Sequence, residues 1–585
     1  MTQTRNFLTV LLLCACLLAA CGILGRDKEV VKGELGTRLD EYLTKITPFG
    51  FSGACLVAKD GKIILNKGYG MAVRSEGVKN TSQTVFSVGS ITKQFTAAGI
   101  MKLEMEGKLN THDLLSTYLE GVPTDKASIS LHDLLTHTSG LIQDVGKDYD
   151  VAERDETVKK ILEQPLESHP GERFEYTNVG YTLLAAVIEK LSGQPYEEFL
   201  NQNLFNPAGM HFTGYRLPQW NERVVAHWYV GGTDNGTPLE KPYPYWNLIG
   251  NGGILSTTED MYKWHLALTG DKILSTDAKE KLYTTYLNDY AYGWDVLDTP
   301  HGILIQHNGG SVLGNSAEFI RYVDADVVIV LLCNESYGTE PLSEVVRHKI
   351  EALVFGGELK APPSVRKADP ANLARFVGEY KLPSGGFLKV SVEGGRLTIT
   401  AEGQDALNPL VFPEHADPNF CQNLNRLSQE IFQAAIQGDY GPFGEVLANK
   451  EGRLDRVREF INTRTMAYQD RTGVIQKAKA LGTLPSSYEE GAVETIVELK
   501  GQKGSIFFSS IWLDDKNIGV APVRSAKTIA IPFLPVSKSE FAGYHLGMAQ
   551  DVRVSFQTGD AGLVAGLTIH CTGTNIKARK LAGDI

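Results

Sequence analysis

The stretch FSVGSITKQFTAAG, residues 86–99, places Ser90 and Lys93 three residues apart where a turn leads into a predicted helix. Gly89 allows a tight turn before the helix. Positions i and i+3 of a helix lie on the same face, so the Lys93 amine can reach the Ser90 hydroxyl. The amide N–H groups at a helix start disfavour the proton on the lysine. The spacing therefore predicts a serine nucleophile activated by a lysine.

Spacing alone does not identify a catalytic pair, because Ser364 and Lys367 repeat it inside the Pro-rich segment APPSVRKADP. Two further motifs supply context. The first is Tyr176-Thr-Asn178, and the second is the run 307–310, His-Asn-Gly-Gly, which follows a strand-like stretch. Taken singly, the tyrosine also fits a hydrogen-bonded core residue and the histidine a surface residue.

Taken together, in this order and spacing, the motifs resemble the serine β-lactamase and penicillin-binding-protein superfamily. The nearest branch is that of class C β-lactamases, DD-peptidases, esterases and D-aminopeptidases. The resemblance covers residues 33–357. Further stretches that look like landmarks of this family are LLTHTSGL (134–141), GNGGILSTTEDMYKW (250–264), AYGWDV (291–296) and HNGGSVLGN (307–315).

The resemblance implies that Ser90 attacks an acyl carbonyl and forms an acyl-enzyme. Lys93 and Tyr176 would manage its proton, and which of them is the base stays open. Asn178 would orient Lys93 and the substrate. The backbone N–H groups of Ser90 and Gly310 would form the oxyanion hole, a role that needs donors fixed before charge develops.

The same resemblance makes His307 a catalytic residue and Asn308 and Gly309 substrate-binding residues. β-Lactamases usually carry Lys-Thr-Gly here. A neutral imidazole is a weaker partner for a substrate carboxylate than a lysine cation, and the threonine hydroxyl is also missing. Residues 313–315, Leu-Gly-Asn, depart further from the usual Pro-Gly-aromatic run. We therefore expect carboxyesterase or D-amino-acid peptidase activity rather than β-lactam hydrolysis.

Residues 1–20 predict a signal peptide, with Arg5 before the apolar run 7–20. The run ends in Leu18-Ala-Ala-Cys21, which resembles the lipobox of bacterial lipoproteins, and a plain signal peptide or anchor is the alternative. Lipid on Cys21 would tie the chain to a membrane of the bacterial cell envelope, on its periplasmic or extracytoplasmic face. Residues 21–32 are predicted to be a linker.

Composition excludes other classes. The chain of 585 residues carries a net charge of −12, so no nucleic-acid partner is expected. The cysteines beyond residue 21 are far apart and have no histidine at ligand spacing, so we expect no metal site, disulfide framework or cofactor. No Gly-x-Ser-x-Gly elbow occurs, which excludes an α/β-hydrolase. The expected partner is a small-molecule or peptide acyl substrate, and the oligomeric state stays open.

The order of predicted elements is strands, helices and strands again, which predicts an α+β fold. The catalytic domain, residues 33–357, would hold an antiparallel sheet flanked by helices plus an all-helical region, with its first and last strands as neighbours. A Pro-rich linker, 358–367, follows.

The C-terminal part begins with alternating strands that resemble a lipocalin-like β-barrel. Its last strands are expected only near the chain end, so we predict a barrel from residues 368–420 and 536–585. Between these segments we expect an inserted α+β module, 421–535, of the nuclear-transport-factor-2-like type. Three small domains in line are the alternative.

Three functions are compatible with these observations. The preferred one is a cell-envelope serine hydrolase that uses a Ser90 acyl-enzyme on an ester, amide or D-amino-acid peptide. The second is a β-lactamase or penicillin-binding DD-carboxypeptidase. The third is a non-catalytic sensor or binding lipoprotein, against which the intact Ser90, Lys93 and Tyr176 argue.

Overall fold

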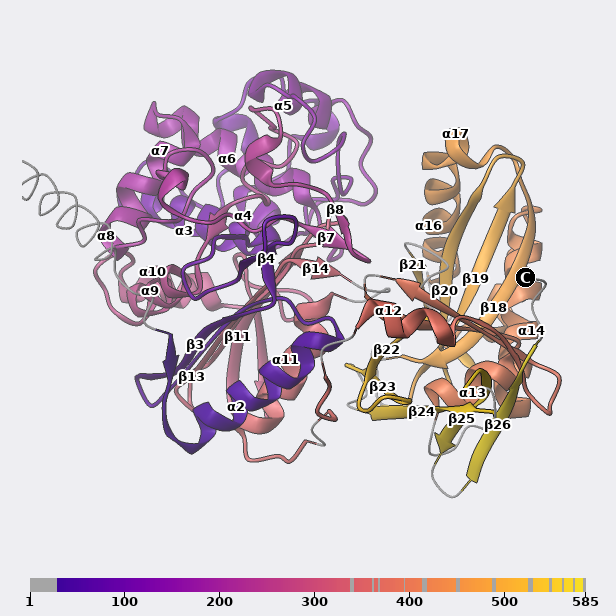
Figure 1. The fold of residues 1–585 in the computed structure, drawn as a ribbon. Helices are drawn as coiled ribbons and strands as arrows, with labels where there is room; N and C mark the ends of the chain where they lie inside the picture. Colours follow the sequence, from indigo (N-terminus) through magenta and orange to yellow (C-terminus); the bar gives the residue numbers. More distant parts are fainter. Residues whose placement is uncertain are drawn as a thin grey trace, which may run out of the picture. The chain divides into compact units, whose positions relative to one another are not determined.

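The computed structural model describes most of the chain beyond residue 28 (Figure 1). The predicted signal peptide and Cys21 lie outside the described residues. The described ranges are 29–336, 341–359, 362–366, 369–393, 395–412, 418–448, 453–486, 491–523, 530–546, 550–559, 562–571 and 574–581.

The chain forms two compact units that do not follow its order. Of the described residues, the first unit contains 29–40, 52–227 and 236–334. The second unit contains residues 41–51, 228–235 and 335–585. The chain therefore passes from the first unit to the second before residue 357, the predicted end of the catalytic domain. No helix of the described ranges combines the length and apolar character needed to cross a bilayer.

A seven-stranded antiparallel sheet forms one layer of the first unit (Figure 1). The strand order confirms that the first and last strands are neighbours, because β2 pairs with β13 along its whole length. In order across the sheet, the strands are β1 (Val30–Val31), β3 (Lys62–Tyr69), β2 (Gly53–Lys59), β13 (Val327–Cys333), β12 (Ser316–Tyr322), β11 (Gly302–Gly310) and β10 (Asp295–Thr299).

The hairpin between β2 and β3 turns at Asp60 and Gly61, both with positive φ, as the Asp-Gly turn predicts.

Helices flank the sheet and form much of the rest of the first unit. They are α2 (Gly33–Ile46), which both units share, α3 (Thr92–Met105), α4 (Leu131–Leu135), α5 (Arg154–Leu162), α6 (Asn178–Ser192), α7 (Tyr196–Leu200), α8 (Asn206–Ala208), α9 (Thr258–Thr269) and α10 (Thr276–Tyr283).

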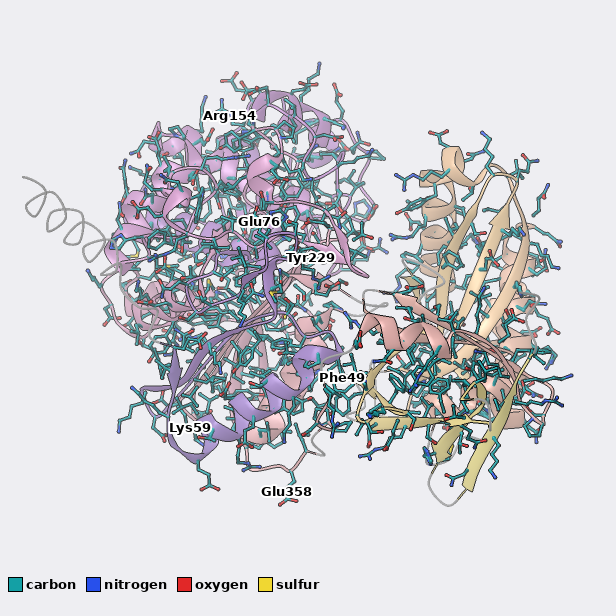
Figure 2. The ribbon with its side chains drawn as sticks, viewed as in Figure 1. Phe49, Lys59, Glu76, Arg154, Tyr229 and Glu358 are labelled. Carbon is teal, nitrogen blue, oxygen red and sulfur yellow. The ribbon has the colours of Figure 1, made fainter. Side chains whose placement is uncertain are left out.

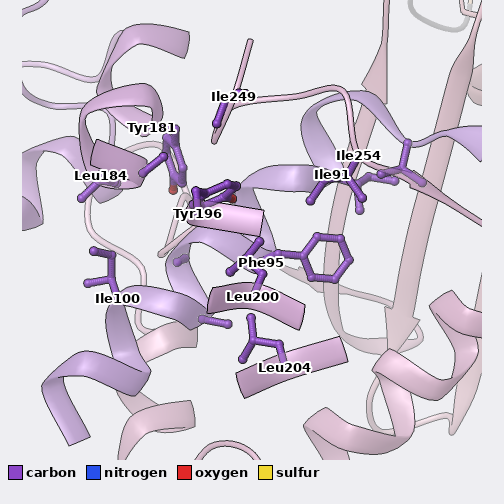
Figure 3. Close-up of a cluster of buried hydrophobic side chains, with 14 of the residues drawn as sticks. Ile91, Phe95, Ile100, Tyr181, Leu184, Tyr196, Leu200, Leu204, Ile249 and Ile254 are labelled. Carbon is purple, nitrogen blue, oxygen red and sulfur yellow. The ribbon is translucent and has the colours of Figure 1, made fainter. Parts of the chain in front are cut away.

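Helix α3 is the central helix of the first unit. Its side chains are buried on most faces, as its apolar composition predicts. Phe95 and Ile100 of α3 belong to the same core as Leu184 of α6 and Leu200 of α7 (Figure 3). Charged side chains such as Glu76 are exposed at the surface (Figure 2). The buried α3 therefore gives the residues at its N-terminus a rigid support.

The second unit contains a closed antiparallel barrel, which confirms the predicted barrel. Its strands come from two separate stretches of the chain. They are β15 (Gly378–Lys381), β16 (Phe387–Glu393), β17 (Arg396–Glu402), β22 (Ala530–Pro535), β23 (Glu540–His545), β24 (Gln550–Thr558), β25 (Val564–Cys571) and β26 (Thr574–Lys580).

Between the two barrel segments lies a four-stranded sheet with helices. Its elements are α14 (Pro418–Ala435), α15 (Gly441–Val446), α16 (Arg453–Ala467), α17 (Gln469–Thr472), β18 (Ile475–Pro485), β19 (Val493–Gly501), β20 (Ser505–Leu513) and β21 (Lys516–Val523). The remaining elements of this unit are β7 (Tyr229–Val230), β8 (Thr233–Asp234), β14 (Glu335–Ser336), α11 (Leu342–Val354), α12 (Pro370–Leu373) and α13 (Gln404–Val411).

The limits of the barrel differ from the predicted ones. Strand β22 was assigned to the inserted module 421–535, but it pairs with β17 and belongs to the barrel. Pro532 and Pro535 within it weaken the strand signal in the sequence, because proline cannot donate to a ladder. Leu407 of α13 packs in one hydrophobic cluster with barrel residues and with Leu484 of β18. The barrel and the inserted sheet therefore share a core.

Candidate active site

Ser90 lies in a 3-10 turn, Gly89–Ile91, that runs directly into α3. Its Oγ is 3.1 Å from Nζ of Lys93, one turn further along the same face. Ser90 is partly exposed, whereas Lys93 is fully buried. The predicted pair is therefore in contact, with the hydroxyl open to solvent and the amine beneath it.

The Lys93 amine has two other close partners. Its Nζ lies 2.7 Å from Oδ1 of Asn178 and 2.8 Å from the backbone oxygen of Asn251. Burial lowers the pKa of Lys93 to about 7, although the negative charges of Asp144 and Asp148 raise it in opposition. A large fraction of Lys93 is therefore neutral near pH 7. A neutral amine has two N–H bonds, which the two carbonyl oxygens can accept, and its lone pair is then free for the Ser90 O–H.

Tyr176 is the second group beside the nucleophile. The Lys93 Nζ lies 4.7 Å from the centre of its ring. Burial raises the pKa of Tyr176 above the usual value, and a hydrogen bond with Ser90 lowers it in part. Tyr176 therefore stays protonated at neutral pH. The ring of His137 packs against Tyr176, with 4.3 Å between the ring centroids and an interplanar angle of 39°.

Asn178 is the first residue of α6 and connects Lys93 to the loop before that helix. Its Oδ1 accepts from Lys93, while its Nδ2 donates to Oδ1 of Asp144 at 2.8 Å. The carbonyl oxygen of Gln143 accepts from the backbone N–H of Asn178. Because an α-helix leaves its first N–H groups without internal partners, this loop caps the helix that carries Asn178.

Strand β11 approaches the nucleophile turn closely enough to require glycine. A Cβ added to Gly309 would lie 2.5 Å from the backbone nitrogen of Ser90. Gly89 has φ +55°, and a Cβ there would lie 2.4 Å from the nitrogen of Gly310. The two predicted oxyanion donors, Ser90 N–H and Gly310 N–H, therefore belong to backbones that lie side by side.

The pairing of β11 shows where the Gly310 N–H points. The backbone N–H of Ser311 donates to the backbone oxygen of Asn315, so these two residues form a hydrogen-bonded pair. Hydrogen-bonded and non-hydrogen-bonded pairs alternate between antiparallel strands. The next pair, Gly310 with Ser316, is therefore not hydrogen-bonded, and the Gly310 N–H points away from β12. On the opposite edge, β10 pairs with β11 only as far as Gln306. The Gly310 N–H thus lies on an edge that β10 does not cover.

The structure buries His307, which taken singly also fitted a surface residue. His307 is 3% exposed, and burial lowers its pKa to about 3. Its Nδ1 lies 2.5 Å from the Asn308 carbonyl oxygen. A carbonyl oxygen can only accept, so Nδ1 carries the proton of the neutral ring. Nε2 is then an acceptor, and the Tyr290 hydroxyl donates to it at 3.1 Å. Both nitrogens therefore have protein partners, and a catalytic role for His307 stays a prediction. Asn308 itself is exposed.

Several residues of this site had no assigned role in the sequence. They are His137, Asp144, Asp148, Asn251 and Tyr290. His137 and Asn251 lie in the stretches 134–141 and 250–264, which already resembled family landmarks, so those stretches were the available signal. The contribution of Asn251 to Lys93 is a backbone oxygen. A backbone atom leaves no residue-type signature, so this contact could not be read from the sequence.

The comparisons with known proteins agree with this geometry. The β-lactamase family matches residues 49–353, which is more than half of the chain. The chain therefore belongs to the β-lactamase family, and it is a serine hydrolase of the superfamily that also contains penicillin-binding proteins.

Two relatives come from Bacillus subtilis. Penicillin-binding protein 4* is 30% identical over 406 residues, which cover 64% of this chain and 89% of the relative. The putative penicillin-binding protein PbpX is 34% identical over 260 residues, 44% of this chain and 64% of the relative. An octameric penicillin-binding protein homologue from Pyrococcus abyssi is similar in fold over 93% of this chain and 99% of its own, with 19% identity and a TM-score of 0.50.

Proposed function

We propose that the protein is a cell-envelope serine hydrolase that acts through a Ser90 acyl-enzyme on an ester, amide or D-amino-acid peptide. The observation that carries the proposal is the buried Lys93 amine, 3.1 Å from the Ser90 hydroxyl, with a pKa lowered to about 7. An amine in this state can take a proton at physiological pH, which is what a weak hydroxyl nucleophile needs.

In the acylation step, the Ser90 oxygen attacks the acyl carbonyl while its proton passes to the neutral Nζ of Lys93. The negative charge on the carbonyl oxygen is held by the N–H groups of Ser90 and Gly310. The Lys93 proton then passes to the leaving oxygen or nitrogen, directly or through the Tyr176 hydroxyl, as the acyl–leaving group bond breaks. Water hydrolyses the acyl-enzyme by the same proton transfers in reverse.

The pKa values favour Lys93 over Tyr176 as the base. Burial disfavours the charged form of each group, and this leaves Lys93 neutral but leaves Tyr176 with its proton. Near pH 7, therefore, Lys93 but not Tyr176 is substantially present in its deprotonated, basic form. The two groups lie close together and their titrations are coupled, so a pH profile would report the pair.

His307 supports the proposed preference for esters or D-amino-acid peptides over β-lactams. It occupies the place of the lysine that β-lactamases use, and it is buried and uncharged. The runner-up function, a penicillin-binding protein or β-lactamase, is favoured by the similarity to the two Bacillus relatives named as penicillin-binding proteins. Lipid on Cys21 would place the chain at the cell envelope.

The test uses the purified full chain with p-nitrophenyl acetate and with a fluorescent β-lactam. Ser90→Ala is compared with Ser364→Ala, a matched control because Ser364 begins the second Ser-x-x-Lys in the chain. We expect ester turnover that is lost only in Ser90→Ala, and no β-lactam adduct by intact-mass spectrometry.

The other outcomes separate the alternatives. A stable β-lactam adduct on Ser90 would identify a penicillin-binding protein, and rapid β-lactam turnover a β-lactamase. Absence of any Ser90-dependent reaction with these probes and with D-amino-acid peptides would favour the non-catalytic binding protein.

A further inference from the structure

Asp144 fixes the orientation of the Asn178 side chain. A carboxylate can only accept, and it accepts from Nδ2 of Asn178 at 2.8 Å. The amide oxygen of Asn178 is therefore turned to the other side, where it lies 2.7 Å from the Lys93 amine. Without the carboxylate, the amide could rotate and present its N–H₂ group to Lys93, which would remove one acceptor of the lysine N–H bonds.

The loop that carries Asp144 is held at both ends. Before it, the Gln143 oxygen accepts from the first N–H groups of α6. After it, the Lys147 oxygen accepts from Nδ2 of Asn247 at 2.9 Å. Between them, Gly146 has φ +76°, and a Cβ there would lie 2.7 Å from the same Asn247 nitrogen. The position of Asp144 is thus set by the fold around it.

Asp144 also sets the charge that a substrate meets beside Asn178. Its side chain is exposed, and its charge acts on both Lys93 and Tyr176. A second acid, Asp148, lies close enough to Asp144 that the two interact, and it is half-buried. The buried neutral His307 supplies no cation in place of the lysine of β-lactamases. A carboxylate on the acyl group beside Asn178 would therefore meet repulsion from Asp144 and no cation at position 307.

We infer that Asp144 is a positioning residue for Asn178 and selects acyl donors by charge, favouring cationic or neutral acyl groups over those that carry a carboxylate. This inference rests on the proposed hydrolase function and narrows its substrate class. The favoured substrates are esters or amides whose acyl part bears an ammonium group, such as aminoacyl compounds with a free amine.

The test uses three p-nitrophenyl esters of phenylacetic acid that differ only at the para position, which bears hydrogen, a trimethylammonio group or a carboxylate. Each kcat/KM is divided by the rate of hydroxide hydrolysis of the same ester. The full chain is compared with Asp144→Asn, Asp144→Ala and the control Asp150→Asn, an exposed aspartate six residues further along.

We expect the wild type to prefer the cationic over the anionic ester, and Asp144→Asn to reduce that preference at least about fivefold. Since charge interactions near solvent are screened, 1 M salt should shrink the wild-type preference as well. Asparagine at 144 keeps an oxygen that can accept from Asn178 but does not exclude the rotated amide, so Asp144→Asn should lower kcat for the neutral ester less than Asp144→Ala, which should lower it about tenfold or more.

The two hypotheses fail in different ways. If none of the three esters and no D-amino-acid peptide shows Ser90-dependent turnover, the proposed function is wrong. If the neutral ester is turned over but the cationic-to-anionic ratio in Asp144→Asn stays within twofold of the wild type, charge selection by Asp144 is wrong. If Asp144→Ala matches the wild type on the neutral ester, Asp144 does not position Asn178.

Discussion

Gly309 of β11 lies so close to Ser90 that a Cβ on the glycine would reach within 2.5 Å of the serine backbone nitrogen. That nitrogen is one of the two predicted oxyanion donors. The contact is between backbones, so no side-chain rotation can relieve it. The spacing of strand and nucleophile turn therefore depends on the absence of a single methyl group.

Gly309→Ala should accordingly displace β11 from the nucleophile turn and lower kcat for p-nitrophenyl acetate about 10²-fold or more, the size expected for a misplaced oxyanion hole. Steady-state kinetics of the full chain measures the effect. Gly270→Ala is the matched control, since a Cβ there meets no atom closer than 3.8 Å. Equal kcat in wild type and Gly309→Ala would show that this approach is not needed for catalysis.

The acylation rate should rise with pH and reach half of its maximum near pH 7. In the proposed mechanism the neutral form of Lys93 is the base. Burial lowers its pKa to about 7, so the active fraction grows as the proton is lost. Asp144 raises this pKa, because a carboxylate stabilises the nearby ammonium form. Asp144→Asn should shift the midpoint to lower pH, and Asp150→Asn should not. A midpoint that moves to higher pH would contradict the assignment.

The groups around Lys93 support this reading of the pH profile. His137 and His307 both interact with Lys93, and burial lowers the pKa of each well below its usual value. Neither histidine therefore changes charge near pH 7. Asp148, whose pKa is raised by burial and by Asp144, should shift the Lys93 midpoint in the same direction as Asp144 when it is replaced by asparagine.

Tyr290→Phe should destabilise the protein by about 1–3 kcal/mol. The change removes the hydroxyl beside His307 Nε2 and leaves a buried acceptor without that donor. Urea unfolding of the full chain measures the loss. Tyr286→Phe is the control, because Tyr286 is 51% exposed. Equal unfolding midpoints for the two variants would show that the hydrogen bond to His307 is not stabilising.

Leu407→Ala should cost about 2–5 kcal/mol, the range for a leucine truncated in a packed core. Leu407 is 1% exposed and packs where the barrel and the inserted sheet share a core. Hydrogen exchange read by mass spectrometry should therefore speed up in peptides of both β17 and β18. Leu563→Ala, at a site 74% exposed, serves as the control. Faster exchange in only one of the two strands would argue against a shared core.

Cys21→Ala should abolish lipid attachment and move the protein from the membrane to the soluble fraction. The prediction rests on the run Leu18-Ala-Ala-Cys21. Metabolic labelling with a fatty-acid analogue, followed by fractionation, measures it, with Cys55→Ala as the control because Cys55 is buried within β2. Labelling that persists in Cys21→Ala would place the lipid on another residue, and absence of labelling in the wild type would exclude lipidation.

The sequence predicted the parts of the site that depend on short, regular spacings. Ser90 and Lys93 share one helical turn, and Asn178 starts the next helix that reaches them. The sheet and the barrel followed from alternating apolar runs, which are strong local signals.

The unpredicted parts depend on contacts between distant segments. Asp144 reaches Asn178 across 34 residues. The burial of His307 depends on Tyr290, which packs against it from outside the strand. Strand β22 carries two prolines, so only its pairing with β17 reveals it.

The two-part barrel has a consequence for how the chain is made. Strand β15 near residue 380 pairs with β26, which ends at Lys580. Proteins are synthesised from the N-terminus, and domains generally fold as units in that order. The first three barrel strands pair with one another, but β15 and β17 leave the ribosome long before their other partners, β26 and β22. The inserted sheet is therefore complete while the barrel is still open. A nonsense mutation that removes only the last strand would release a chain with two unpaired strand edges, which are templates for aggregation.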